Sequence, residues 1–554
     1  MRVKSIKLTN FKKFKDEHFE FNDDVNIFVG DNNAGKSTIL EALEIVLNYS
    51  YRGRPFNSEF TPDIFNKDAV QLFLASDKSA THLPVLAIEA FIEGVPEYRG
   101  TNNFLKADAQ GITVLVRFDD TLKDVYADHL LTNPHITSIP IEFYKLEWLD
   151  FGWNPVKAVA KKFRALYIDP TRIHPTLGKN QYISTITILN TALKKEELVK
   201  LTLNYRENQQ VFNNSGEVRT VNTGLDTDHL ITEKKLSIAA STLPAGSIQT
   251  SLQLEVDDVP FQFIGKGEQS NVQIKLAIQN KSKDIDLVMM EEPENHLSHT
   301  NLNKLVHYIE NQRGDKQLFL TTHSSYVLNK LSIDKICLVQ SGYKRLHKLA
   351  PAVVKTLKRL PGYDTLRVAL SHKVILVEGP SDELVLKKIY HRKHNRLPEQ
   401  DGIDIIVVRG VGFDTFISVG MEIGTRINVL RDNDGDYDEN VVKVRADYAA
   451  YPNIKLISSA KNEEFSLEPA MIYANATDLV TLDAFAKVVL STQTFNLYDK
   501  VVDLDKRRDF LIDWFRSVQG NGKGARKVDS AIKLFDGTLN FRYPPFLDEV
   551  FDFA

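Results

Sequence analysis

The sequence contains little cysteine and no long hydrophobic segment, and each absence excludes a class of protein. Its single cysteine, Cys337, permits neither an internal disulfide nor a thiolate metal cluster, which agrees with a reducing compartment. No segment approaches the roughly 18 uninterrupted apolar residues that a bilayer-spanning helix needs, so a membrane channel is excluded. Apolar and basic residues alternate from Met1 to Leu8, which predicts a half-exposed strand, not a signal peptide, and a cytoplasmic protein.

A strong charge of either sign is also missing. The formal net charge of -4 over 554 residues does not by itself indicate a nucleic-acid-binding protein. Contact with a phosphate backbone would need a local basic face. A run of this kind is more often a solvated helix surface, and an example is formed by Lys387, Lys388, Arg392, Lys393 and Arg396. With 43% apolar and 26% charged residues the composition is that of a soluble globular protein, and about 150 residues per domain predicts three or four domains.

A complete Gly-x-x-x-x-Gly-Lys-Ser phosphate loop occupies residues 30–37. An apolar, strand-like run precedes it, and apolar residues at helical spacing follow it. In a strand-loop-helix arrangement the backbone N–H groups face the phosphates, Lys36 reaches the β- and γ-phosphates, and the Ser37 hydroxyl binds Mg²⁺. We therefore predict an ATP site made by Gly30, Asn32, Asn33, Gly35, Lys36, Ser37 and Thr38.

Three later motifs are those expected to accompany the loop in an ATPase. The first lies at 265–270 and supplies Gly267 and Gln269, although a Gly-x-Gly alone also fits a plain loop before a helix. The second is an apolar strand that ends in Glu291, near the Mg²⁺ shell, and Glu292, which can polarise a water for attack on the γ-phosphate. The third is a strand that ends in His323, placed to meet the same phosphate.

The stretch from about 170 to 245 is polar, with few large apolar residues. Its apolar spacing predicts an amphipathic helix over 186–203. We interpret it as a helical insertion that buries its apolar face by self-association. It is too short for an extended coiled coil, which needs many sustained heptads.

The second half of the chain places acidic residues directly after apolar strands. One strand, 373–377, ends in Glu378, and the next helix carries Asp382 with Ser381 as its predicted cap. A later strand, 427–430, leads into Asp432, Asp434 and Asp436. Strands separated by helical lengths predict a parallel sheet with these acids at one edge.

The acidic run does not fit a calcium-binding helix-loop-helix. Such a loop needs Gly at its sixth position and Glu at its twelfth, and counting from Asp432 these are Tyr437 and Lys443. Hard carboxylates instead suit Mg²⁺, or Mn²⁺, in phosphodiester cleavage. Glu468 offers one more carboxylate, and Lys523, with Lys527 close by, offers a cation for the cleaved phosphate.

Two motif sets resemble known families. Residues 30–37, 265–269, 291–294 and His323 resemble the ATP-binding-cassette ATPases that include chromosome-maintenance and recombination-repair proteins, although Glu291 replaces the usual Asp and the signature loop lacks its Leu-Ser opening. The strands ending in Glu378 and in Asp432-x-Asp434 resemble a Toprim domain. Their combination resembles the overcoming-lysogenization-defect (OLD) family of nucleases, which includes Gabija-type defence nucleases.

The resemblance implies a fold and its divisions. We expect an α/β protein with an ABC-type ATPase domain at 1–168 and 246–350, interrupted by a helical dimerisation insertion at 169–245. A linker at 351–371 would then precede a Toprim domain at 372–554.

The resemblance also implies the site roles. The metal ligands would be Glu378, Asp432, Asp434 and Glu468 with Asp382 and Asp436 supporting, Ser37 would bind the nucleotide's Mg²⁺, and Lys523 would be the phosphate-side cation. ATP would join two subunits, each signature loop closing over the other's nucleotide. The implied activity is metal-dependent cleavage or nicking of DNA in phage defence, by a homodimer or larger homo-oligomer.

Several alternatives stay open. A DNA-binding repair ATPase with a non-cleaving Toprim scaffold belongs to a different class. Topoisomerase is disfavoured because too little sequence follows Lys527 for a strand-capturing tyrosine domain. Primase is disfavoured because no zinc-binding module is present. The sequence leaves open the requirement for a second defence protein, the DNA specificity, and the sign of the ATP effect.

Overall fold

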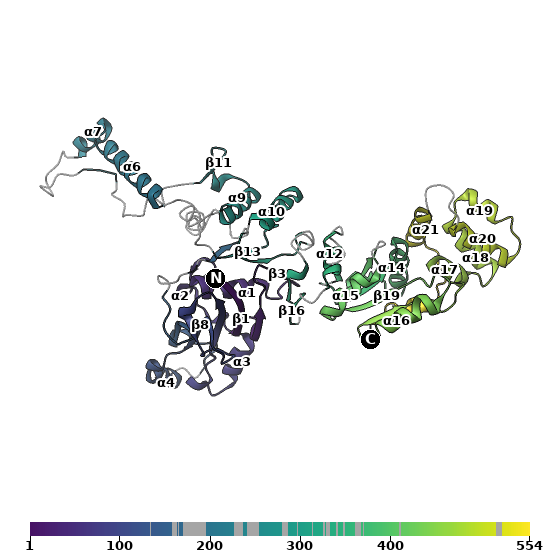
Figure 1. The fold of residues 1–554 in the computed structure, drawn as a ribbon, viewed down its shortest axis with the longest axis horizontal. Helices are drawn as coiled ribbons and strands as arrows, with labels where there is room; N and C mark the ends of the chain where they lie inside the picture. The colour runs from purple at the N-terminus through teal and green to yellow at the C-terminus, as the bar shows by residue number, and fades with distance from the viewer. Residues whose placement is uncertain are drawn as a thin grey trace. The chain divides into compact units, whose positions relative to one another are not determined.

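The computed structural model describes residues 1–132, 135–157, 163, 165–169, 195–225, 237–240, 254–279, 286–295, 297–312, 314–324, 327, 333–339, 342–346, 350–359, 367–368, 370–408, 412–516 and 523–553. The chain divides into two compact units, Met1–His323 and Ser324–Ala554 (Figure 1). The finer division proposed from the sequence stays a prediction. Across these ranges, the structure contains no helix with the length and apolar character needed to cross a membrane.

An antiparallel sheet forms one layer of the first unit. Its order is β2-β1-β6-β8-β7, with β9 also paired to β8. The strands are β1 (Arg2–Phe11), β2 (Phe14–Glu20), β6 (Leu86–Glu93), β7 (Arg99–Gly100), β8 (Ala109–Phe118) and β9 (Tyr144–Asp150). One face is fully buried, for example at Ile88 and Val114, whereas the neighbouring Glu89 and Thr113 face outward and are only partly buried. This alternation is the period-2 pattern of a sheet with one covered face.

A parallel sheet forms the second layer of this unit. It contains β10 (Ala165–Ile168), β13 (Leu287–Glu291), β14 (Gln317–Thr321) and β3 (Val25–Val29), in that order. Its strands are buried nearly throughout, which confirms the strands predicted before the phosphate loop and before Glu291 and His323. The buried Gln317 accepts from the Val3 N–H and donates to the carbonyls of Val3 and Asn22, each at 2.8 Å. Segments about 300 residues apart in sequence are therefore joined directly.

Helix α1 (Lys36–Asn48) contacts strands of both sheets (Figure 1). It is buried along most of its length, as expected for a helix between two layers. Gly35 immediately precedes it with φ 107°, and a Cβ there would lie 2.5 Å from the Phe14 ring. Only glycine satisfies both the left-handed backbone and the close ring contact.

The other elements of the first unit are short or peripheral. They are β4 (Ser50–Tyr51), β5 (Arg54–Pro55), α2 (Phe56–Glu59), α3 (Lys67–Ala75), α4 (Lys123–Thr132), α6 (Lys195–Asn213), α7 (Gly216–Leu225), β11 (Glu255–Val256), β12 (Val259–Pro260), α9 (Lys266–Gln279) and α10 (His299–Gln312). The predicted helix over 186–203 is helical from Lys195 onward, and 186–194 lie outside the described residues. Val211 and Phe212 of α6 are exposed by 70% and 55%.

The second unit is built on a four-stranded parallel sheet of order β18-β17-β19-β20. The strands are β17 (Lys373–Val377), β18 (Ile403–Val407), β19 (Arg426–Leu430) and β20 (Ile454–Ile457), with α14 (Pro380–His394) and α15 (Phe413–Ile423) between them. The predicted parallel sheet with helical connections is thus confirmed. A core of buried apolar residues joins the sheet to the C-terminal helices.

The remaining elements of this unit are β15 (Ile336–Val339), β16 (Tyr343–Arg345), α12 (Pro351–Arg359), α16 (Lys443–Asp447), α17 (Leu467–Asn475), α18 (Leu479–Val489), α19 (Thr492–Tyr498), α20 (Leu504–Arg516), α21 (Lys523–Asp536) and α22 (Phe546–Glu549). The segment expected to be a linker therefore contains helix α12. The prediction that Ser381 caps α14 is wrong. Gly379 is the cap, Pro380 starts the helix, and the Asp382 carboxylate accepts from the Gly379 N–H at 2.9 Å.

Candidate functional site

Two acidic residues meet at the carboxyl edge of the second unit's sheet. Glu378 follows β17 and Asp432 follows β19, and these strands are hydrogen-bonded parallel neighbours. The Asp432 N–H donates to the Glu378 carboxylate. Asp434, two residues further, has a left-handed backbone (φ 49°), and its N–H donates to the carbonyl of Phe465 at 3.1 Å. The predicted sheet-edge cluster is therefore present in the fold.

The acids of this edge influence one another's protonation. Burial, with Asp382, Glu378 and Glu468 nearby, raises the pKa of Asp432 to about 9. Burial and the Glu468 charge raise the pKa of Asp382 to about 7. Burial of the carboxyl group and the Asp434 charge also raise the pKa of Glu378, although much of that residue's surface is exposed. Like charges in a poorly hydrated site disfavour ionisation, so a cation would be strongly attracted.

Glu468 and Lys527 complete this cluster from two C-terminal helices. The Lys527 ammonium lies 2.6 Å from Oε2 of Glu468, which also accepts from the Ser466 hydroxyl at 3.1 Å. Burial lowers the pKa of Lys527, but Glu468, Asp432 and Asp382 outweigh it, so the net shift is upward. The side chain of Lys523, the lysine first chosen from the sequence, lies outside the described residues.

Asn433 is a site residue that the sequence pattern did not reveal. Its side chain is fully buried and donates to the carbonyls of Ser459 and Lys461, both at 2.9 Å. Its Oδ1 accepts from the Gly435 N–H at 2.9 Å. Because it stands between Asp432 and Asp434, this anchor fixes the loop that carries both acids. The sequence does contain one sign of this role, which is an asparagine inside a run of aspartates. A solvated turn would accept any polar residue at that position, so the sign is weak.

Asp436 has a structural contact next to the acidic cluster. Its Oδ1 accepts from the Glu439 N–H at 3.1 Å, which supports the helical turn at Asp438–Val442. The predicted supporting role of Asp436 at a metal stays a prediction.

The cluster suits a divalent cation chemically. Among the residues that the structure describes, Glu468 Oε1 is buried without a hydrogen-bond partner, and the neighbouring acids offer hard carboxylate oxygens as metal ligands. In the described part of the chain no three His, Cys, Asp or Glu side chains are already grouped at ligating geometry. The residues that fit the ion are Glu378, Asp382, Asp432, Asp434 and Glu468, as proposed ligands.

The phosphate loop of the first unit has its key groups in place. Lys36 is buried, and its ammonium donates to the carbonyls of Gly30 at 2.9 Å and Asp31 at 3.0 Å. Burial lowers its pKa, although Glu292, Asp31 and Glu291 oppose that effect. The Ser37 hydroxyl donates to Glu291, so the two predicted groups around Mg²⁺ are in contact.

Comparison with known proteins finds a family match in each unit. Residues 1–236 match the family described as AAA ATPase domain, and residues 370–434 match the overcoming lysogenization defect protein-like TOPRIM domain. The chain joins an AAA ATPase domain to an OLD-like TOPRIM domain. It is thus an ATPase–TOPRIM protein with the domain pairing that resembles the OLD family, and the mixed α/β fold class is confirmed.

Individual relatives of this ATPase–TOPRIM protein are distant. Endonuclease GajA of Bacillus cereus (strain VD045) is 22% identical over 458 residues, which cover 78% of this chain and 75% of the relative. DNA replication and repair protein RecF of Clostridioides difficile (strain 630) is 23% identical over 365 residues, which cover 58% of this chain and 91% of the relative. The SMC head domain from Thermotoga maritima matches with a TM-score of 0.28 and 14% identity, covering 61% of this chain and 94% of that structure.

Glu292 and His323, the predicted γ-phosphate residues, lie together in the first unit. His323 Nε2 lies 3.5 Å from Oε1 of Glu292, and Glu292 Oε2 accepts from the Asn295 amide at 2.7 Å. Glu292 has a left-handed backbone (φ 40°), and its N–H donates to the Thr321 carbonyl at 3.0 Å. An acid in a sparsely populated conformation next to a histidine fits the predicted catalytic pair.

The contacts of the other predicted nucleotide-binding residues do not by themselves indicate a nucleotide site. Asn32 is exposed and Thr38 half-buried. Asn33 is left-handed (φ 63°), and its carbonyl accepts from Lys13 at 2.9 Å. Gly267 and Gln269 lie in the first turn of α9, where the Gln269 amide donates to the Phe261 carbonyl at 2.7 Å. Their roles stay predictions.

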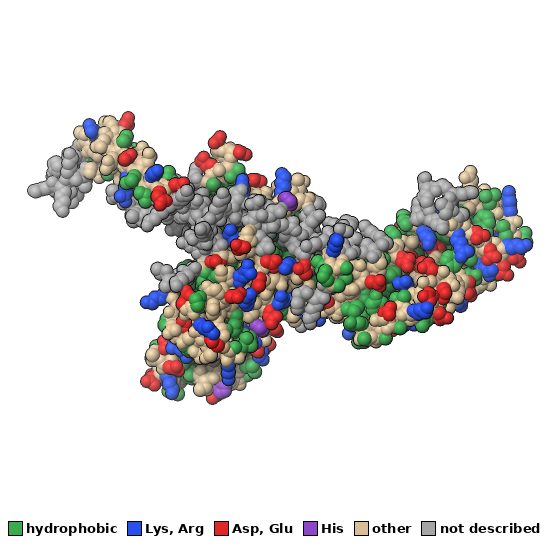
Figure 2. Space-filling model, in the orientation of Figure 1, with side chains coloured by type: hydrophobic (Ala, Val, Ile, Leu, Met, Phe, Trp, Pro, Cys, Tyr) green, Lys and Arg blue, Asp and Glu red, His purple; other side chains and the backbone are tan. Residues whose placement is uncertain are grey.

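The basic run on α14 and just after it is largely neutralised inside the second unit. Lys387 pairs with Glu383 at 2.8 Å and Glu399 at 2.6 Å, and Lys393 pairs with Asp548 at 2.5 Å. Lys388 donates to the carbonyls of Phe535 and Gly537, and Arg392 donates to the carbonyl of Phe541. Arg396 pairs with Asp401. Figure 2 shows basic and acidic side chains interspersed on the visible face of the described residues. The run therefore attaches C-terminal segments to α14, in agreement with its structural interpretation.

Proposed function

We propose that this chain is an ATP-regulated, divalent-metal-dependent DNA endonuclease that acts in anti-phage defence. The observation that carries the proposal is the meeting of Glu378, Asp432, Glu468 and Lys527 at one sheet edge. Three acids and one lysine from separated segments share this site, and repulsion among the acids costs stability. Such an arrangement is typical of functional sites.

The proposed chemistry follows from the groups present. A divalent ion at these carboxylates, Mg²⁺ or Mn²⁺, would polarise a phosphodiester and activate a water. Because the pKa values of Asp432 and Asp382 are raised to about 9 and about 7, metal binding would be coupled to proton release from these acids. Lys527 supplies a fixed positive charge beside the carboxylates, suited to the phosphate that develops negative charge.

The ATPase half is proposed as the regulator. Lys36, Ser37 and Glu291 would hold Mg-ATP, with Glu292 and His323 at the γ-phosphate. A homodimer in which Gly267 and Gln269 face the other subunit's nucleotide, and a cytoplasmic location, are part of the same proposal. The defence role rests on the OLD-family resemblance, and GajA is named as an endonuclease.

A plasmid-nicking assay tests the nuclease. Wild type in Mg²⁺ or Mn²⁺ should convert supercoiled to open-circle DNA, and D432A/D434A should not. E463Q is the matched control, because Glu463 is an exposed acid in the Glu468 segment. Equal activity in wild type and D432A/D434A, or none in either with both metals, would favour the repair ATPase with a non-cleaving TOPRIM scaffold.

Nucleotide control is tested separately. Nicking rates are compared with ATP, with a non-hydrolysable analogue and without nucleotide, for wild type and K36A. A rate that depends on nucleotide in wild type but not in K36A supports regulation through the phosphate loop. Identical rates in all three conditions would reject the regulatory part and leave the nuclease intact.

A further inference from the structure

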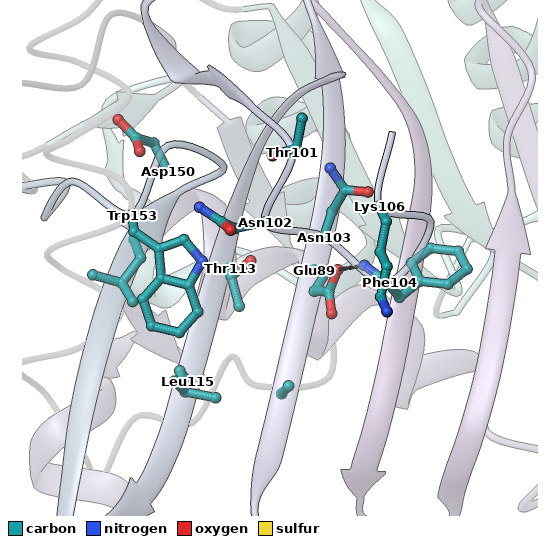
Figure 3. A pocket seen from close by; sticks show the side chains of 12 residues that line it. Glu89, Thr101, Asn102, Asn103, Phe104, Lys106, Thr113, Leu115, Asp150 and Trp153 are labelled. Carbon is teal, nitrogen blue, oxygen red and sulfur yellow. Dashed lines mark hydrogen bonds between the residues drawn. The ribbon is translucent and has the colours of Figure 1, made fainter. Parts of the chain in front are cut away.

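A cavity of about 720 Å³ lies on the outward face of the antiparallel sheet, away from the phosphate loop's helix. Its floor is a set of outward side chains from three neighbouring strands: Ala87, Glu89, Thr113, Leu115 and Leu149 (Figure 3). In the strand register Glu89 is opposite Thr113, and Thr113 is opposite Leu149. Two loops form the walls, one at Thr101–Lys106 and one at Trp153. The volume is that of a small-ligand site.

Both walls are fixed before any ligand arrives. The Trp153 side chain is 49% exposed. Its backbone is left-handed (φ 69°), which is an unusual conformation for a bulky residue. Its turn is closed by the Trp153 N–H bond to the Asp150 carbonyl at 2.9 Å and by the Asp150 carboxylate, which accepts from the Asn154 N–H at 2.8 Å. Under this turn a Cβ at Gly100 would lie 2.0 Å from the Phe151 carbonyl oxygen. The indole is therefore held out by a rigid support.

The opposite wall is fixed by its own side chains. Asn103 is buried and donates to the Ala107 carbonyl at 2.7 Å. The following residue, Phe104, donates its N–H to Oε2 of Glu89 at 2.7 Å (Figure 3). A preformed cavity loses little entropy when a ligand binds.

Glu89 presents an acceptor to this cavity. Burial raises its pKa, although the Phe104 N–H and the Lys7 charge oppose that effect. Lys7 already pairs with Asp16 at 2.7 Å, and Lys106 is an exposed residue of the rim. Within the described residues Thr113 Oγ1 is buried without a hydrogen-bond partner, and rotation about χ1 would turn this hydroxyl toward the cavity. The Glu89 carboxylate and the Thr113 hydroxyl are thus acceptors on the floor of the cavity, while Asn102 and Lys106 line its wall (Figure 3).

We propose that this cavity binds a guanidinium group on an alkyl stem, either a small arginine derivative or an arginine side chain of another protein. The planar cation stacks on Trp153. The same guanidinium group has enough N–H donors to reach both Glu89 and Thr113. The methylene stem lies on Ala87, Leu115 and Leu149. An ammonium would offer neither the flat face nor the forked donors.

Calorimetric titration of the full chain tests the proposal. The two sources are represented by agmatine and by a capped Gly-Arg-Gly peptide, and the neutral citrulline peptide is the isosteric control. We expect one or both guanidinium probes to bind, roughly tenfold or more tighter than citrulline. Tighter binding of agmatine points to a small molecule, and tighter binding of the peptide points to a protein partner.

Variants locate the binding at the cavity. E89Q should weaken it roughly tenfold, and W153L or T113V should each weaken it several-fold. E93Q, on the same strand but exposed and paired with Lys4, should bind as wild type, with thermal unfolding as the folding control. D432A/D434A should also bind normally, which separates this site from the nuclease. Equal affinity for citrulline, no binding of either guanidinium probe, or unchanged binding by E89Q would overturn the proposal.

Discussion

The ammonium of Lys527 lies 2.6 Å from the Glu468 carboxylate. Its positive charge also favours the ionised forms of Asp432 and Asp382. Glu468 lies in the first turn of α17 and Lys527 lies in the first part of α21. The contact therefore joins two helices at the sheet edge where the acids collect.

We expect K527M to reduce plasmid nicking by tenfold or more, because the fixed positive charge beside the proposed metal ligands is lost. Removing one partner of a buried pair should also lower the free energy of unfolding by ~2–4 kcal/mol. K523M tests the lysine first predicted, and K533M is the control on the same helix, since Lys533 pairs with the exposed Asp529. A larger loss in K523M than in K527M would return the role to Lys523.

The metal-free protein should become more stable when Asp432 is replaced by Asn, while nicking is lost. The folded pKa of Asp432 is raised to about 9, above its unfolded value, so its contribution to stability is present in acid and is lost as pH rises toward 9. D432N removes that loss and should add on the order of 1–3 kcal/mol at pH 8 and little at pH 4. Chemical denaturation in EDTA at both pH values measures this. A destabilised D432N at pH 8 would contradict it.

Asn433 should matter as much as the acids beside it. N433A leaves the carbonyls of Ser459, which is buried, and Lys461 without their donors and should cost ~1–3 kcal/mol of stability while reducing nicking and apparent Mg²⁺ affinity. N453A is a matched control, because Asn453 donates to the Thr425 carbonyl at 2.8 Å, away from the acids. Similar Mg²⁺ dependence in the two variants would show that Asn433 serves stability alone.

E292Q should retain nucleotide binding and lose ATP hydrolysis by ~10²-fold or more, because Gln keeps the amide contact to Asn295 but not the basic carboxylate. K36A should instead lose binding, which a fluorescent ATP analogue measures directly. Hydrolysis by E292Q at the wild-type rate would remove Glu292 from the catalytic role.

Local sequence patterns predicted the helices and strands better than they predicted which side chains meet in the folded protein. The strand, loop and helix around Lys36 and the strands before Glu378 and Asp432 are encoded in adjacent residues, so periodicity and glycine placement reveal them. Parallel pairing then places acids at one edge without further information. The pairing of Lys527 with Glu468 depends on how two helices pack, which no local spacing specifies. For the same reason the Glu89 cavity, formed by three strands and two loops, had no sequence signal.

The attachment of Gln317 to Val3 and Asn22, together with the pairing of β3 with β14, also sets an order of events during synthesis. The phosphate loop leaves the ribosome early, but its strand finds its partner only after Thr321 has been added. At typical elongation rates of ~5–20 residues per second, the nascent loop waits roughly 15 to 60 s beside an uncovered apolar strand. A chain halted before that point carries a complete nucleotide motif in sequence, yet it lacks the neighbouring strand that holds the motif in shape.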